Sequence, residues 1–181
     1  MLNDATRFGL VSRVIHWAMA ALILGLLILG TKLNTMQPGL ANLWLYGLHK
    51  TMGLTAFALV LLRLIWHRIS PPPAPIGPPK AWETRVAKAV HHLTYALLVL
   101  IPLAGWAYAS ATGLDIMFAD RWVIPPIAPV SVAWENGARL AHSVLTKLLM
   151  AVLVLHVTGA LRRAVKGDGT LSRMIWKAQQ D

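Results

Sequence analysis

The chain has 181 residues, of which 56% are hydrophobic and only 13% are charged. A soluble globular domain carries about 25% charged residues, so the composition excludes an ordinary water-facing exterior and favours lipid as the solvent. The absence of cysteine excludes disulfides, thiolate-ligated iron–sulfur clusters, thiolate zinc sites and covalently attached c-type haem.

Four long apolar segments follow one another along the chain. They predict helices at about 10–31, 46–67, 84–111 and 137–163, each near the ~20 residues needed to cross the hydrocarbon core of a bilayer. Pro102 lies within the third segment and should kink that helix. The sequence therefore predicts an all-α, integral membrane four-helix bundle that forms one domain over residues 1–181 and is surrounded by membrane lipid.

Basic residues divide unequally between the two ends of this bundle. One end is expected to carry Lys32, Lys50, Arg121, Arg139 and Lys147, and all other Lys and Arg residues fall at the opposite end. The positive-inside rule then places both termini in the cytoplasm. A net charge of +10 could indicate nucleic-acid binding, but its distribution fits membrane topology, and we expect no nucleic-acid partner.

Two connections have a distinct composition. Residues 70–79 read SPPPAPIGPP, which predicts a stiff, extended connector at the inner end. The longer connection 112–137 mixes large apolar residues with three prolines. We expect it to lie on the outer face and cap the bundle.

Histidines near the ends of the apolar segments carry the functional information. The fourth helix holds His142 and His156, which are 14 positions apart in the sequence. That spacing corresponds to about 21 Å along a helix axis and places both side chains within about 40° of one face. By depth, His49 can meet His142 at the outer level and His16 can meet His156 at the inner level. Ionisable residues inside membrane segments are costly and usually have a partner or a function.

Two opposed histidines at each level suit the axial positions of a haem iron. Zinc generally needs three or four protein ligands. Gly53 follows His49 by four residues on the same face, where a missing side chain would let a porphyrin lie against the backbone. A lone membrane histidine is more often an ordinary interhelical hydrogen-bonding residue, but four at matched depths favour the ligand interpretation.

Other polar residues have weaker assignments. We expect His91 to lie at the inner interface, where it could touch a haem propionate or a quinone. Lys147 is either a snorkelling lysine or a charge that acts on the outer haem or on an anion. Arg139, with Lys50 and Arg121, either attracts small anions to the outer face or anchors the helices at the interface.

The combined pattern resembles the bacterial cytochrome b561 family. It comprises His16-Trp17 at the start of the first helix, His49-x-x-x-Gly53 in the second, the proline-rich connector before His91, and the His142/His156 pair. The resemblance implies two haem b groups, with His16 and His156 as ligands of the inner one and His49 and His142 as ligands of the outer one. It also implies location in the bacterial inner membrane and electron exchange with ubiquinone. Some members of the family look like superoxide oxidases, for which Lys147 and Arg139 are positional candidates as catalytic residues.

Three functions follow from this pattern. The leading one is a membrane oxidoreductase that takes electrons from superoxide at the outer face and reduces quinone. The second is a membrane-anchor cytochrome b subunit that relays electrons for a partner dehydrogenase or hydrogenase. The third is a non-redox transporter or assembly factor, which would contain no haem.

Overall fold

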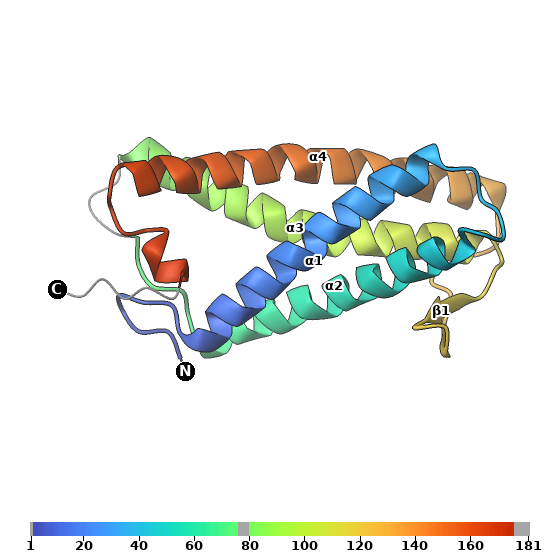
Figure 1. Ribbon diagram of the computed structural model, residues 1–181, viewed down its shortest axis with the longest axis horizontal. Helices are drawn as coiled ribbons and strands as arrows, with labels where there is room; N and C mark the ends of the chain where they lie inside the picture. Colours follow the sequence, from blue (N-terminus) through green and yellow to red (C-terminus); the bar gives the residue numbers. More distant parts are fainter. Residues whose placement is uncertain (1, 76–79, 176–181) are drawn as a thin grey trace.

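The computed structural model describes residues 2–75 and 80–175, and over these the chain forms four long helices (Figure 1). The helices are α1 (Leu10–Thr35), α2 (Leu43–Ile69), α3 (Ala81–Ala111) and α4 (Val132–Val165). Each is long and apolar enough to cross a membrane. The predicted all-α four-helix bundle is therefore confirmed. Every observed helix contains the range expected from the sequence and extends beyond it at one or both ends.

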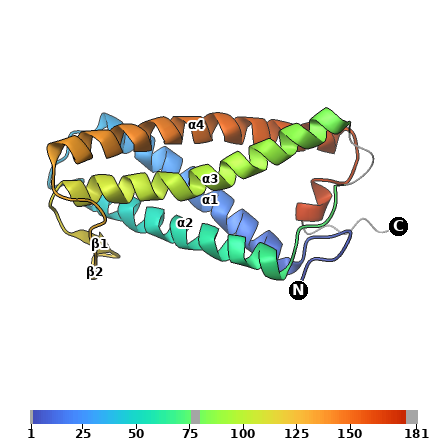
Figure 2. The ribbon, with the colours of Figure 1, turned by 180° about the vertical axis from the view of Figure 1, so that it is seen from behind.

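The helices are arranged as neighbouring pairs. Contacts between α3 and α4 are the most extensive, α2 contacts both α1 and α3, and α1 crosses the bundle obliquely (Figure 1). The α3 helix contains Pro102 and changes direction part-way along its length (Figure 2), as expected for a helix with an internal proline. The buried core joins Leu97 of α3 to Leu149 and Val152 of α4, with Ile23 of α1 packed against them.

Proline and glycine set several helix ends. The α2 helix ends at Ile69, and Ser70 separates it from the run that begins at Pro71, because proline cannot continue a helical hydrogen-bond pattern. Residues 71–75 have no regular secondary structure, and the rest of the expected extended connector, 76–79, lies outside the described residues. The α3 helix gives way to Gly113, whose φ of 76° lies in the left-handed region that glycine tolerates best.

The connection between α3 and α4 contains a small antiparallel hairpin. Strands β1 (Ile116–Phe118) and β2 (Trp122–Ile124) pair, with Phe118 opposite Trp122. Ala119 and Asp120 form its turn, both with φ of 52°. The backbone N–H of Ala119 donates to Thr51 Oγ1 over 3.0 Å, which fixes the hairpin to the first part of α2.

Segments distant in sequence meet at the opposite end, where α1 begins and α4 ends (Figures 1 and 2). The side-chain amide nitrogen Nδ2 of Asn3 donates to the carbonyl oxygens of Ser70 and Pro71. The 3-10 turn η1 (Ser172–Met174) returns to α1, where Trp17 Nε1 donates to the Met174 carbonyl oxygen over 2.7 Å. Arg173 bonds the carbonyl oxygens of Thr6 and Ala74. These contacts hold the N-terminal segment, the α2–α3 connector and the segment after α4 together next to the start of α1.

Candidate haem-binding site

Two histidine pairs lie between the helices at two levels. At the inner level, the rings of His16 on α1 and His156 on α4 have centroids 6.3 Å apart. At the outer level, the rings of His49 on α2 and His142 on α4 are also 6.3 Å apart. Two imidazoles on opposite sides of one metal ion, each bonded at about 2 Å through a ring nitrogen, have centroids roughly 6 Å apart. Both separations fit axial ligation of one iron between each pair.

His142 is held in the tautomer that metal ligation needs. Its Nδ1 lies 2.9 Å from the carbonyl oxygen of Ile101 on α3. A carbonyl oxygen only accepts hydrogen bonds, so Nδ1 carries the proton and Nε2 keeps its lone pair. A histidine ligand is commonly oriented by such a hydrogen bond through its other ring nitrogen.

Glycines on neighbouring helices make room for both outer rings. A Cβ built at Gly105 of α3 would lie 3.0 Å from Cε1 and from Nδ1 of His142. A Cβ built at Gly30 of α1 would lie 3.1 Å from Cε1 of His49. Ordinary contacts begin at 3.4 Å, so any larger residue at either position would displace the ring it faces.

The outer level also contains buried polar atoms without a hydrogen-bond partner among the described residues, and open space next to α2. Nδ1 of His49 and Oγ1 of Thr146 are buried and have no hydrogen-bond partner among the described residues. A Cβ built at Gly53 meets nothing within 4 Å. Gly53 is one helical turn from His49, so open space lies on the ligand-bearing face of α2. The donor set and this space fit a flat ring ligated by two histidines.

The inner level is more polar. The ring of His91 on α3 lies 5.4 Å from that of His156. Arg63 on α2 places Nη1 at 3.2 Å from Nδ1 of His16, and its Nε donates to the hydroxyl of Tyr95 over 2.8 Å. Side chains from all four helices therefore converge around His16 and His156.

The two candidate catalytic cations are not members of these pairs. Lys147 and Arg139 are both exposed on α4. At about 100° per residue, Lys147 points about 140° around the helix from His142, and Arg139 about 60°. Both side chains therefore lie on the exposed surface of the bundle, and their catalytic role stays a prediction.

Three residues of the site were missed from the sequence. Gly30 and Gly105 each occupy a helix interior, where glycine costs about 1 kcal/mol relative to alanine and usually has a packing reason. Arg63 lies six positions before the end of α2, inside a candidate membrane span. An intramembrane arginine is by itself a signal of function.

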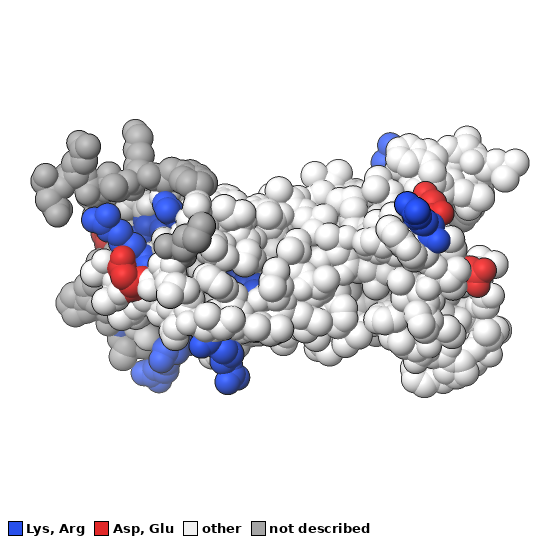
Figure 3. All heavy atoms as spheres, turned by 90° about the horizontal axis from the view of Figure 1, so that it is seen from below, with Lys and Arg blue, Asp and Glu red and all other residues white. Residues whose placement is uncertain are grey.

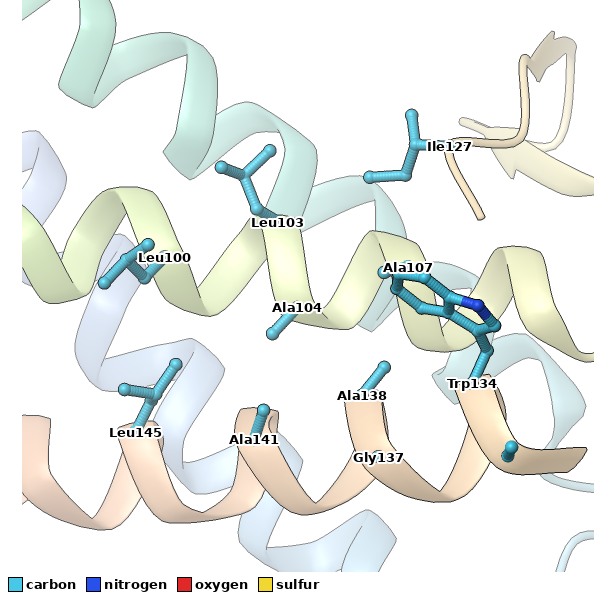
Figure 4. A pocket seen from close by; sticks show the side chains of 11 residues that line it. Leu100, Leu103, Ala104, Ala107, Ile127, Trp134, Gly137, Ala138, Ala141 and Leu145 are labelled. Atoms are coloured by element: carbon cyan, nitrogen blue, oxygen red, sulfur yellow. The ribbon is translucent and has the colours of Figure 1, made fainter. Parts of the chain in front are cut away.

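An apolar groove runs between α3 and α4 (Figure 4). Its volume is about 710 Å³, and small side chains such as Ala104, Ala138 and Ala141 form much of its lining. Trp134 lies at one end, and its indole N–H is the sole side-chain hydrogen-bond donor among the lining residues. Ala141 precedes His142 directly, so the groove reaches the depth of the outer pair, and at this point its lining residue points about 100° around α4 from His142. It can accept an apolar chain.

The histidine pairs do not extend to larger metal clusters. In the part of the chain that the structure describes, no group of three or more His, Cys, Asp or Glu side chains could hold a metal ion. A tetrahedral site of zinc type is therefore absent from residues 2–75 and 80–175. Opposed pairs of imidazoles suit a planar cofactor that itself supplies the remaining ligands.

Comparison with known proteins agrees with this geometry. The family model for prokaryotic cytochrome b561 matches residues 7–177. The chain is 29% identical to cytochrome b561 homolog 2 of Escherichia coli K12 over 99% of this chain and 96% of that protein. It is 28% identical to cytochrome b561 homolog 1 of the same organism over 70% of this chain and 72% of that protein. It is 23% identical to a protein of Yersinia pestis named probable superoxide oxidase CybB, over 90% of this chain and 92% of that protein. The resemblance seen in the sequence is thus confirmed, and the chain belongs to the prokaryotic cytochrome b561 family of membrane electron-transfer proteins, which bind haem b.

Proposed function

We propose that the chain is a single transmembrane cytochrome b domain that binds two haem b groups and transfers electrons from superoxide to ubiquinone. His16 and His156 hold the inner haem, and His49 and His142 hold the outer one. The observation that carries this proposal is the pair of equal ring separations, 6.3 Å at each of two levels of α4. A structural role for the histidines would give no reason for the same spacing twice.

The bound haems supply one-electron redox chemistry. His16 with His156, and His49 with His142, would hold the two haems, and substrates would exchange electrons with them without ligating the metal. The chain's own residues fix the ligand rings, exclude water and set the local charge. The balanced reaction oxidises two superoxide ions to two molecules of dioxygen and reduces one quinone, with two protons, to the quinol.

Charge at the outer face supports an anionic donor. Lys50 is adjacent to His49, and Arg139 is within one turn of His142. The guanidinium of Arg121 lies over the ring of exposed Trp122, 5.3 Å from its centroid. Cations gathered around a site of this kind raise the local concentration of small anions. The relative named a probable superoxide oxidase is consistent with superoxide as that anion.

The groove between α3 and α4 supports quinone as the acceptor. Its apolar lining suits an isoprenoid chain, and its position next to His142 brings such a chain to the outer level of the bundle. Trp134 could donate one hydrogen bond to a ring carbonyl. Quinone reduction at this groove rests on shape and polarity.

We further propose that the protein is oriented with both termini in the cytoplasm, in a bacterial inner membrane. The end at which α1 begins and α4 ends is strongly basic, whereas the opposite end mixes a few basic and acidic residues (Figure 3). Excess Lys and Arg mark the cytoplasmic side of a membrane protein. A single cysteine in place of Ser172 or of Asp120 tests the orientation when it is labelled with a membrane-impermeant maleimide, from the outside in intact spheroplasts and from the inside in inverted membrane vesicles.

The first experiment is a dithionite-reduced minus oxidised spectrum of the detergent-purified protein, with haem b quantified as pyridine haemochrome. We expect two low-spin haems per chain. Stopped-flow mixing with superoxide and a soluble ubiquinone analogue should then give quinol faster than spontaneous dismutation consumes superoxide. Colourless protein would defeat the proposal. Two haems without superoxide oxidation, together with tight co-purification of a larger redox subunit, would favour the relay function instead.

A further inference from the structure

Arg63 is a cation inside the bundle whose hydrogen bonds and ring contacts, among the described residues, are all to neutral groups. It lies on α2 within a candidate membrane span and is half-buried. Its Nε bonds the Tyr95 hydroxyl, its Nη1 faces Nδ1 of His16, and its guanidinium carbon is 5.9 Å from the Tyr95 ring centroid. The ion pairs found among the described residues are Arg162–Glu83, Lys166–Glu83 and Arg163–Asp168. None of these carboxylates neutralises Arg63, although a charge in a membrane bundle is costly without an anionic partner.

The contact between Arg63 and His16 is incompatible with metal ligation by that histidine. Arginine only donates hydrogen bonds, so His16 Nδ1 must accept here and its proton must reside on Nε2. A metal bonded to Nε2 would move the ring proton to Nδ1, which would then face Arg63 donor to donor. A metal bonded to Nδ1 would occupy the acceptor itself. In either case Arg63 loses this partner when an iron binds His16.

At the outer level the histidine ring is the hydrogen-bond donor, whereas at the inner level the ring of His16 is the acceptor. His142 Nδ1 donates to the Ile101 carbonyl oxygen, a contact that persists when Nε2 binds a metal. The ring of His142 is therefore already arranged for a metal. At the inner level, binding of an iron to His16 would leave the guanidinium of Arg63 without a hydrogen-bond acceptor.

We propose that Arg63 binds a propionate carboxylate of the haem held by His16 and His156, and that its positive charge raises the reduction potential of that haem. This inference rests on the proposed di-haem function. A guanidinium matches a carboxylate through two parallel N–H donors. Tyr95 keeps the guanidinium turned toward the bundle interior. A fixed cation close to the iron favours the less positive, ferrous state, because Coulomb interactions are strong in a poorly polarisable environment.

A redox titration of the full-length protein tests the proposal. Arg63→Gln should lower the ratio of ferrous to ferric inner haem about tenfold at a fixed ambient potential, which is 59 mV for a one-electron couple. The outer haem should titrate as in the wild type. Arg63→Lys keeps the charge and should change the ratio less than about threefold. The matched control is Arg68→Gln, which removes an exposed cation from the end of the same helix and should change neither haem.

Esterified haem separates the carboxylate contact from a general effect of charge. Protein from haem-deficient cells is reconstituted with iron protoporphyrin or with its dimethyl ester. The ester should bind the inner level of the wild type at least tenfold more weakly than the free acid, and Arg63→Gln should abolish most of that difference. If the wild type and Arg63→Gln prefer the free acid over the ester by the same factor, propionate is excluded as the partner.

The outcomes distinguish this inference from the function on which it rests. A wild type without haem overturns both. Two haems in Arg63→Gln with unchanged titrations overturn the role of Arg63 alone. If Arg63→Gln lacks the inner haem, Arg63→Lys decides. An inner haem retained in the lysine variant at nearly the wild-type potential supports the proposal, and an inner haem missing from both variants overturns it.

Discussion

Replacing Gly105 by alanine should weaken the outer haem site specifically. The added Cβ would lie 3.0 Å from two atoms of the His142 ring, so the ring must shift by a few tenths of an ångström. The ring is bonded to the Ile101 carbonyl oxygen of the same helix, which limits where it can move. Overpacking of this kind costs about 1–3 kcal/mol, and partial loss of the hydrogen bond about 1 kcal/mol. A combined cost of about 2–4 kcal/mol corresponds to roughly 30- to 700-fold weaker binding of the outer haem.

Gly159→Ala is the matched control, because a Cβ at Gly159 of α4 meets nothing within 4 Å. It should gain up to about 1 kcal/mol of helix propensity and keep both haems. The assay is haem per chain by pyridine haemochrome, followed by the rate of haem transfer to excess apomyoglobin. If Gly105→Ala retains both haems and releases them as slowly as Gly159→Ala, then Gly105 does not position His142.

Four further substitutions probe the haem site and the groove between α3 and α4. His16→Ala and His142→Ala should each remove one haem of the two, and their reduced spectra should differ; a variant that keeps two low-spin haems would reassign the ligand. Gly30→Ala should weaken binding of the outer haem less than Gly105→Ala does, by about three- to thirtyfold. Its Cβ would lie closer than 3.4 Å to one His49 atom alone, Cε1, at 3.1 Å. Unchanged haem release would contradict this packing. Ala141→Phe should fill the groove and raise the KM for a long-chain quinone about tenfold with haem per chain unchanged; an unchanged KM would place the quinone elsewhere.

The fold could be predicted from hydropathy because a lipid solvent leaves the backbone few choices. Each span must satisfy its own hydrogen bonds, so long apolar segments become helices. The observed helices run past the apolar segments, since polar residues beyond the hydrocarbon can continue the same hydrogen-bond pattern. The hairpin was not predicted because its turn uses Ala119 and Asp120 with φ of 52°, whereas left-handed hairpin turns are typically marked by Asn-Gly or Asp-Gly.

The depth of each histidine could be predicted, because axial rise along a helix is almost independent of tertiary structure. The residues that orient the rings could not. Gly30 faces His49 from α1, and Gly105 faces His142 from α3. Which glycine meets which ring depends on the crossing of two helices, and the period of one helix carries no information about that crossing.

The two levels of the bundle therefore hold their histidines by different means. The outer ring of His142 is oriented by an uncharged backbone acceptor and by the absence of a side chain at Gly105, so its position follows from packing. The inner ring of His16 lies beside the guanidinium of Arg63, which is oriented by Tyr95. Side-chain charge is easier to alter by substitution than backbone geometry, because a change at Arg63 leaves the helix crossing intact. If the proposed role of Arg63 holds, the potential difference between the two haems, and with it the direction in which electrons accumulate, is set at the inner level by one residue that is not itself a ligand.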